Sequence, residues 1–338
     1  MRIVLISYTP IGSSGGVPRF NRDLRAALPE GSCVHYSWWD CANAFGRDPE
    51  AQDIPEWDKA RILNSWLLQT RRVTSDDIVI ADSFWASGLE HLPMCVSHQH
   101  GNWGHVTKAD RDAGKLPEFP VHERVQTDFR KRYLDAGRKL TTVSDFIADQ
   151  MMLQWGFPSV VIGNGIDTKK FVPPIEKKKR SRPVIIHFST TWNKGLDHIT
   201  ELKRSVDADV LLLDEAVSFF SMPKYPALAQ ADLVVHPSAH EGNSYAVLET
   251  LASDVPIVSY DVGLMYTARR ENAPVGYVIS VVDRCKEETE NMVREALDDK
   301  NRGDLRPRDW VLRFDLENFR SSWLEYLGKE FGYYTRSA

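Results

Sequence analysis

Short apolar runs and longer segments with helical periodicity alternate along most of the chain. The first apolar run, Arg2–Tyr8, is followed by a glycine-rich segment and by a helical pattern that ends at Leu28. The same order returns at Val184–Ser189, which precedes a turn and the helical segment Leu196–Val206. Apolar runs of this length, bounded by turn residues, indicate buried strands, and strands that alternate with helices indicate parallel sheets. The pattern therefore predicts an α/β protein with two doubly wound units.

Further strands and helices follow from the same pattern. Strands are predicted at Cys33–Trp38, Asp77–Ile80, Met94–Ser97, Lys139–Asp145, Val210–Leu213, Ala231–Pro237, Pro256–Tyr260 and Val275–Val282. Helices are predicted at Lys59–Val73, Val121–Ala136, Tyr245–Ala252, Cys285–Leu297 and Trp310–Leu327. Residues 172–182 are strongly basic, bracketed by prolines and free of apolar periodicity, which is typical of a linker. We therefore expect domains at 1–171 and 183–309.

The stretch from His240 to Thr250 carries the clearest chemical signal. It joins a predicted strand to a predicted helix through a turn that contains a glycine, and either Asn243 or Ser244 is suited to cap the helix. Unpaired N–H groups and the positive end of the helix dipole then point toward one place, where a phosphate or diphosphate binds well. Glu241 and Glu249 flank this place and suit hydroxyl groups. A diphosphate with many hydroxyls describes a sugar nucleotide.

Composition narrows the class of protein. The chain has 338 residues, 42% of them hydrophobic, and a net charge of −5, values typical of a soluble globular protein with two cores of domain size. No stretch approaches the roughly 20 apolar residues of a membrane span, and no signal peptide is evident at the N-terminus. The four cysteines form no CxxC pair, so neither a disulfide framework nor a zinc site is expected. A cytoplasmic location fits these features.

The spacing Glu241-x7-Glu249, with Gly242 beside the first glutamate, resembles the signature of retaining glycosyltransferases of family 4. This resemblance implies the GT-B fold, in which two Rossmann-like, doubly wound domains face each other across a cleft. It also implies that Glu241 lies by the donor sugar and that Glu249 hydrogen-bonds the ribose of the nucleotide. In the same family the last helix, here 310–330, packs back on the first domain. The donor-binding residues implied in this stretch are Gly242, Asn243, Ser244, Tyr245 and Glu249.

Other motifs resemble the same family and occur in the family's order. Gly15-Gly16 resembles the loop that approaches the donor diphosphate and the acceptor, and His100-Gly101-x-Trp103 resembles the segment whose histidine contacts the donor sugar. Asn164-Gly165 resembles the end of the family's first domain. Lys194 resembles the lysine that neutralises the donor phosphates. Where the family usually has an arginine, five residues before that lysine, this chain has Ser189, so one phosphate contact is unaccounted for.

The resemblance implies an enzyme that uses a nucleotide-diphosphate sugar, with a UDP-sugar as the expected co-substrate, and no bound cofactor. His100, Lys194 and Glu241 are the expected catalytic residues. In the expected reaction the diphosphate leaves, and the acceptor hydroxyl attacks from the same face of the sugar. GT-B enzymes generally need no metal, although the histidines at 98, 100 and 105 leave a metal site as an alternative.

The acceptor is open at this point. A glycan or lipid-linked saccharide is the first expectation, with at most peripheral membrane contact. Gly16–Phe20, Gln99-His100 and Thr190–Gly195 also resemble phage α-glucosyltransferases that modify hydroxymethylated DNA bases. The basic residues of 169–182 and of the helix around Arg124 and Arg130–Arg132 would suit such a nucleic-acid acceptor. A sugar-nucleotide sensor without activity is a further alternative, and the absence of a GxGxxG fingerprint argues against a dehydrogenase.

Overall fold

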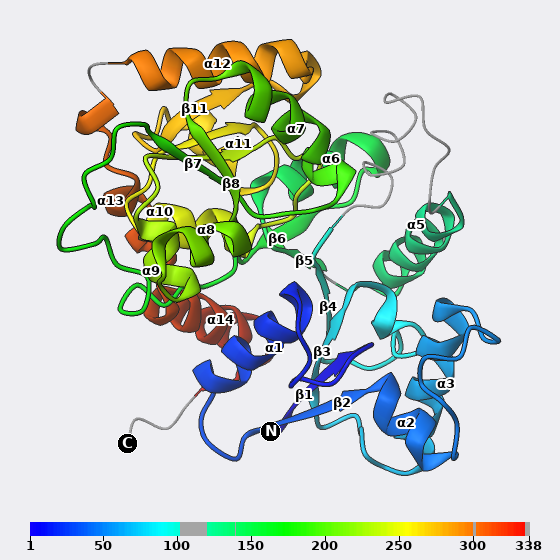
Figure 1. The fold of residues 1–338 in the computed structure, drawn as a ribbon. Coiled ribbons are helices and arrows are strands. Elements are labelled where there is room, and N and C mark those ends of the chain that lie inside the picture. Colours follow the sequence, from blue (N-terminus) through cyan, green and yellow to red (C-terminus); the bar gives the residue numbers. More distant parts are fainter. Residues whose placement is uncertain (102–119, 139, 300–301, 335–338) are drawn as a thin grey trace. The chain divides into compact units, whose positions relative to one another are not determined.

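Two parallel β-sheets organise the chain, one in each of two units (Figure 1). The structure, a computed structural model, describes residues 1–101, 120–138, 140–299 and 302–334. The first unit comprises Met1–Gly165 and Leu316–Ala338, and the second comprises Ile166–Asp315. The division at Gly165 falls before the predicted boundary at 171, so the predicted linker at 172–182 lies within the second unit.

The first unit contains a six-stranded sheet in the order β2-β1-β3-β4-β5-β6. Every neighbouring pair of its strands is parallel. The strands are β1 (Ile3–Ser7), β2 (Cys33–Ser37), β3 (Ile78–Asp82), β4 (Cys95–Gln99), β5 (Leu140–Thr142) and β6 (Ser159–Val161). The order reverses between β1 and β3, which are neighbours although β2 separates them in sequence. In open parallel sheets, ligands bind outside the carboxyl ends of the strands at such a switch point.

Helices pack against this sheet, and their buried side chains form a hydrophobic core with those of the strands. The helices of the first unit are α1 (Gly16–Ala27), α2 (Trp38–Ala44), α3 (Glu56–Gln69), α5 (Pro120–Asp135), α6 (Asp145–Trp155) and α14 (Leu316–Phe331), with the 3-10 turn η1 (Ser83–Ala86). Phe20 and Leu24 of α1 pack with Phe319 and Trp323 of α14 against buried residues of β1. The C-terminal helix therefore belongs to the core of the first unit, although the whole second unit precedes it in sequence.

The second unit contains a five-stranded sheet in the order β11-β10-β9-β7-β8, again parallel throughout. Its strands are β7 (Val184–His187), β8 (Asp209–Leu212), β9 (Leu233–His236), β10 (Ile257–Tyr260) and β11 (Gly276–Ile279). Here the switch point lies between β7 and β9. The loops that follow these two strands therefore meet at one edge of the sheet.

Both faces of the second sheet are covered by helices (Figure 1). The helices are α7 (Leu196–Ser205), α8 (Leu213–Phe220), α9 (Lys224–Ala229), α10 (Tyr245–Ala252), α11 (Leu264–Arg270), α12 (Lys286–Asp298) and α13 (Pro307–Val311). The short 3-10 turns are η2 (Trp192–Lys194), η3 (Val281–Asp283), η4 (Arg302–Asp304) and η5 (Leu312–Phe314). In β7, Val184 and Ile186 join the core under α8–α11, whereas Ile185 joins the core under α7 and α12. This alternation follows the two-residue period of a strand that is buried on both faces.

The predicted helix Trp310–Leu327 is wrong in one respect, because the structure divides it into α13, η5 and α14. The break lies at Asp315, whose backbone is extended, at the point where the chain returns to the first unit. The backbone N–H of Ile166 donates to the Phe314 carbonyl at 2.8 Å, and Ile166 pairs with Asp315 as an isolated parallel bridge. No helix of the described residues has the length and apolar character that a membrane span requires.

Candidate active site

The switch point of the second sheet brings together the loops after β7 and β9. The loop after β7 carries Ser189 and Lys194, and the loop after β9 carries His240–Ser244. These segments are tied directly, because the N–H of Ala239 donates to the carbonyl of Asn193 at 3.1 Å. The sequence placed Lys194 and Glu241 in one site although 46 residues separate them, and the structure brings their side chains into contact.

Glu241 is the centre of this contact. Its Oε1 accepts a hydrogen bond from Lys194 Nζ at 2.7 Å and another from His236 Nε2 at 2.8 Å. Lys194 Nζ also donates to the His240 carbonyl at 3.2 Å. Because an ionised carboxylate only accepts, the bond to His236 places a proton on Nε2 of that ring. We refer to Lys194, His236 and Glu241 as the switch-point cluster.

Burial alone would raise the pKa of Glu241. The charge of Lys194 and the hydrogen bond from His236 outweigh burial and hold the pKa well below its usual range. Glu241 is therefore a carboxylate, only 9% exposed, with a fixed orientation. A buried carboxylate with further lone pairs can accept hydrogen bonds from the hydroxyl groups of a ligand.

Two glycines allow the loops to approach each other. Gly195 has a φ of +85°, and a Cβ on it would lie 2.4 Å from Pro237 Cγ. Gly263, between β10 and α11, has a φ of +57°, and its Cβ would lie 2.7 Å from the carbonyl oxygen of Gly242. Any larger residue would have to displace backbone at both places. The positions of Lys194 and Glu241 therefore depend on these glycines.

Helix α10 begins at the residue predicted from the sequence. Ser244 is its N-cap, as one of the two predicted positions. Its side chain, however, forms no capping hydrogen bond. The first-turn N–H groups of a helix have no carbonyl one turn earlier to bond. Asn243 before the cap is buried, and Tyr245 after it is half-buried. Glu249 lies further along the same helix and is 7% exposed.

Ser189 takes part in a local turn. Its Oγ is 2.9 Å from Oγ1 of Thr191 and accepts from the Thr191 N–H at 3.2 Å. The hydroxyl is thus engaged within its own loop, and the position carries no charge. Lys194 is the cation that this loop contributes to the switch-point cluster.

The first unit has its own polar cluster near the carboxyl ends of β3 and β4. His100 Nε2 donates to Asp82 Oδ1 at 2.9 Å, and Asn21 Nδ2 donates to Asp82 Oδ2 at 2.9 Å. The ring of Phe20 meets the His100 ring edge to face, with centroids 4.7 Å apart. The imidazole of His100 is therefore held by a buried carboxylate and by an aromatic ring. Asp82 and Asn21 were not singled out from the sequence, although Asp82 ends a predicted strand region.

The glycine loop precedes the same cluster. Gly15 has a φ of +115° and is the N-cap of α1, whereas Gly16 has open space where a Cβ would be. Arg22 of α1 holds this loop, because its Nη1 donates to the carbonyls of Ile11 and Ser13 at 2.9 Å each. Gly15 and Gly16 are both exposed at the helix end.

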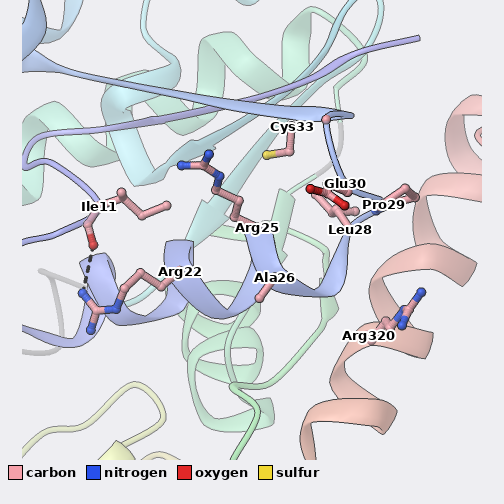
Figure 2. A pocket seen from close by; sticks show the side chains of 10 residues that line it. Ile11, Arg22, Arg25, Ala26, Leu28, Pro29, Glu30, Cys33 and Arg320 are labelled. Atoms are coloured by element: carbon pink, nitrogen blue, oxygen red, sulfur yellow. Dashed lines mark hydrogen bonds between the residues drawn. The ribbon is translucent and has the colours of Figure 1, made fainter.

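A hollow of about 700 Å³ lies elsewhere in the first unit, along α1 and the turn into β2 (Figure 2). Arg22, Arg25, Glu30, Cys33 and Arg320 are among its lining residues, and Arg22 is engaged with the Ile11 carbonyl. Cys33 begins β2, so this part of the hollow is near the amino end of a parallel strand. Ligands of such sheets bind at the opposite, carboxyl end.

Two of the histidines that suggested a metal site, His98 and His100, have other partners. His98 is fully buried and its Nδ1 is 2.8 Å from Thr141 Oγ1, and burial lowers its pKa well below the usual value. Trp103 and His105 lie outside the described residues. Within the described part of the chain, no group of three or more His, Cys, Asp or Glu side chains is arranged to hold a metal ion.

Comparison with known proteins gives the fold a context. Residues 172–299 match the family model of glycosyl transferases group 1. The structure is similar to sucrose-phosphate synthase from Thermosynechococcus elongatus, with a TM-score of 0.74, 13% identity and coverage of 98% of this chain and 100% of that one. It is also similar to Anabaena HepE in complex with UDP, with a TM-score of 0.68, 16% identity and coverage of 97% and 100%.

HepE in complex with UDP-glucose gives a TM-score of 0.67 at 14% identity, with coverage of 97% of this chain and 100% of that one. No curated protein sequence matches the chain. The two parallel-sheet α/β units and these likenesses along nearly the whole chain confirm the predicted GT-B fold. The switch-point cluster and α10 lie inside the matched range 172–299.

Proposed function

We propose that the protein is a retaining glycosyltransferase that transfers a sugar from a nucleotide-diphosphate sugar to an acceptor hydroxyl. The switch-point cluster carries this proposal, because it places a lysine and a buried carboxylate at the edge where parallel sheets bind ligands. Its location within residues that match glycosyl transferases group 1 supports the same reaction. The UDP and UDP-glucose complexes of HepE support a uridine nucleotide as the donor.

In the proposed reaction, the bond between the anomeric carbon and the diphosphate oxygen breaks, and a bond from the acceptor oxygen to the same face of that carbon forms. The acceptor proton passes to the departing diphosphate. Lys194 and the first turn of α10, at Asn243–Ser244, stabilise the charge that develops on the diphosphate. Donors fixed before the reaction stabilise such charge well, because they need no reorganisation at the moment of reaction.

The carboxylates have separate roles in this proposal. Glu241 accepts hydrogen bonds from the donor sugar, and Glu249 accepts from the ribose. His236 keeps Glu241 in place when Lys194 turns toward the phosphates. The roles of His100, Gly15 and Gly16, in the first unit, stay predictions from the family resemblance, and Asp82 would orient His100.

The test is a screen of sugar nucleotides against saccharide, lipid-linked and hydroxymethylated DNA acceptors, read by mass spectrometry. We expect a mass increase of one sugar residue on one acceptor class, with an α-linked donor giving an α-linked product by NMR. Glu241→Gln, which the proposal expects to reduce transfer, serves as the reference variant. If donors bind without hydrolysis or transfer above background, the protein is a sensor and the proposed activity is wrong.

A further inference from the structure

Arg284 has a half-buried guanidinium that bonds the backbone of Pro237, the residue after His236 of the switch-point cluster. It follows η3 and precedes α12, and its Nε donates to the Pro237 carbonyl at 3.0 Å. Its guanidinium carbon is 6.0 Å from the centroid of the Tyr260 ring. The backbone of the next residue, Cys285, bonds the Tyr260 hydroxyl through both its N–H and its carbonyl. Arg284 is therefore held at the carboxyl edge of the sheet.

The same Pro237 carbonyl locates Arg284 relative to Lys194. Its oxygen lies 2.7 Å from the place of a Cβ on Gly195, the residue that follows Lys194. The charge of Arg284 also affects the pKa of a residue in the first turn of α7. The pKa of His198 there is lowered to about 4, mainly by burial and next by Arg284. Arg284 thus adds a second positive charge beside the turn that carries Lys194.

This charge has no close counterion in the part of the chain that the structure describes. Burial lowers the pKa of Arg284, and Asp197 is the acid that most opposes this effect. No carboxylate of the described residues lies within ion-pair distance of the guanidinium, and Lys286 Nζ is 3.7 Å from Asp197. Nη1 and Nη2 of Arg284 form no hydrogen bond to a described residue. Burial of a guanidinium with unused donors costs free energy. An anion that accepts hydrogen bonds from these donors offsets this cost.

We propose that Arg284 binds a phosphate group of the donor diphosphate, together with Lys194. The inference rests on the proposed function. A guanidinium can form two parallel hydrogen bonds to phosphate oxygens, and Nη1 and Nη2 are available for them while Nε keeps its bond to Pro237. Ser189, in the loop that also carries Lys194, is uncharged and bonded to Thr191, so Arg284 supplies the second cation from a different element.

The competing explanation is a structural role, in which Arg284 only fixes the Pro237 carbonyl. The two roles differ in what they predict for ligands with and without phosphate. Arg284→Gln removes the charge and keeps a donor, and Arg284→Lys keeps the charge. Arg294→Gln is the matched control, because Arg294 lies on the neighbouring helix α12 and is paired with Glu290.

The experiment compares the affinities of UDP, uridine and inorganic pyrophosphate for these variants by calorimetry and ligand-observed NMR. Arg284→Gln should weaken the binding of UDP and of pyrophosphate about 10- to 100-fold, the range for hydrogen bonds to a charged group, and leave the affinity for uridine unchanged. Arg284→Lys should retain part of the affinity for UDP, and Arg294→Gln should match the wild type. Unchanged UDP affinity in Arg284→Gln, or an equal loss of affinity for uridine, would overturn the proposal.

Failure of the proposed function gives a different result. If the wild type binds neither UDP nor another nucleoside diphosphate, the donor assignment is wrong. The binding of pyrophosphate then tests whether Arg284 forms an anion site. Binding of pyrophosphate that is lost in Arg284→Gln keeps the anion site, and no difference between the wild type and this variant removes it.

Discussion

Glu241 shares one carboxylate oxygen between Lys194 and His236. Lys194 is therefore neutralised within the protein before any ligand arrives. A diphosphate that binds Lys194 has to compete with Glu241, and this competition releases one lone pair of the carboxylate for a sugar hydroxyl. His236 maintains the hydrogen bond to Glu241 during this exchange. In the proposed function, donor binding and the availability of Glu241 for a sugar hydroxyl are thus coupled through one pair of side chains.

Lys194→Ala tests the part of this exchange that concerns the leaving diphosphate. The variant should lose about 2–4 kcal/mol of transition-state stabilisation, the range for one preorganised donor. The fold should persist, because Lys194 ends a short 3-10 turn and its side chain is 30% exposed. Steady-state kinetics gives the loss in kcat/KM, and circular dichroism checks the fold. Near-normal turnover in the folded variant would remove Lys194 from the reaction.

Glutamine variants separate the two glutamates without leaving large cavities. Glu249→Gln should weaken the binding of UDP by about 1.5–3 kcal/mol, because it removes the charged acceptor assigned to the ribose. Glu241→Gln should leave UDP affinity unchanged or increase it, since Lys194 loses its internal partner, and should reduce transfer. Calorimetry with UDP alone measures both effects. Equal losses of UDP affinity in the two variants would show that the assignment is wrong.

At the scale of elements, the site depends on two turns that only glycine allows. Gly195 closes the loop after β7 against Pro237, and Gly263 closes the loop after β10 against Gly242. Both glycines have positive φ values, and both hold the backbone next to a residue of the switch-point cluster. The geometry of the side chains is therefore set by backbone contacts between three loops at one edge of the sheet.

Gly195→Ala should lower the stability of the second unit by about 2 kcal/mol or more, because it combines a left-handed backbone with a clash against Pro237. Urea unfolding measures this change, and transfer assays should show a loss of activity beyond the loss of folded protein. Gly303→Ala is the control, since a Cβ there meets no heavy atom within 4 Å. The prediction fails if both variants unfold at the same urea concentration.

The long elements could be predicted from the sequence because apolar periodicity alone specifies them. The prediction of α10 at Tyr245–Ala252 is confirmed in both bounds, and the strands before and after it are confirmed in position. Short helices were missed because they follow a strand without a loop. Helix α2 follows β2 directly, and its signal is the capping box between Ser37 and Asp40.

The division of the last predicted helix could not be read from the sequence. The segment from Trp310 to Leu327 contains neither glycine nor proline, so its local preference is a continuous helix. The extended residue Asp315 and its bridge to Ile166 interrupt it. Tertiary pairing overrides helix propensity at this point, as it often does.

The contact between Lys194 and Glu241 was expected from the sequence, whereas the contacts of His236 and Asp82 were not. Lys194 and Glu241 could be identified because each lies in a turn with a recognisable motif, and the structure places their side chains 2.7 Å apart. His236 and Asp82 are the last residues of buried strands. In the sequence, a polar residue at this position only indicates that the apolar run has ended. Their position at the carboxyl end of a parallel strand was the available signal.

At the scale of the whole molecule, the basic stretch 169–182 is used mainly inside the second unit. Lys177 and Lys178 donate to the carbonyls of Ala231 and Phe220. Arg180 pairs with Asp232, and Arg182 pairs with Asp207 and Asp209. These bonds attach residues 177–182 to the edge of the sheet. Four of the seven cations of this stretch are therefore engaged within the second unit and are less available to contact phosphates.

This use of charge leads to a prediction about the acceptor. Hydroxymethylated duplex DNA should bind weakly even at low salt, and its affinity should fall only shallowly toward physiological salt, because few contacts to phosphates release few counterions. A saccharide or lipid-linked acceptor should be modified at physiological salt. Fluorescence anisotropy over a salt series, together with the transfer assay, measures both. Tight binding at low salt that falls steeply with added salt, together with glucosylation of hydroxymethylated DNA, would show that the acceptor is DNA.

The central claim is that the second unit binds a nucleoside diphosphate through the switch-point cluster and α10, without a metal. Calorimetric titration of UDP in excess EDTA tests it most directly. The account predicts saturable binding of one UDP per chain in EDTA, weakened in Lys194→Ala and not strengthened by added magnesium or manganese. The contradictory result is the absence of binding by UDP and by other nucleoside diphosphates, or binding that appears only when the metal is restored.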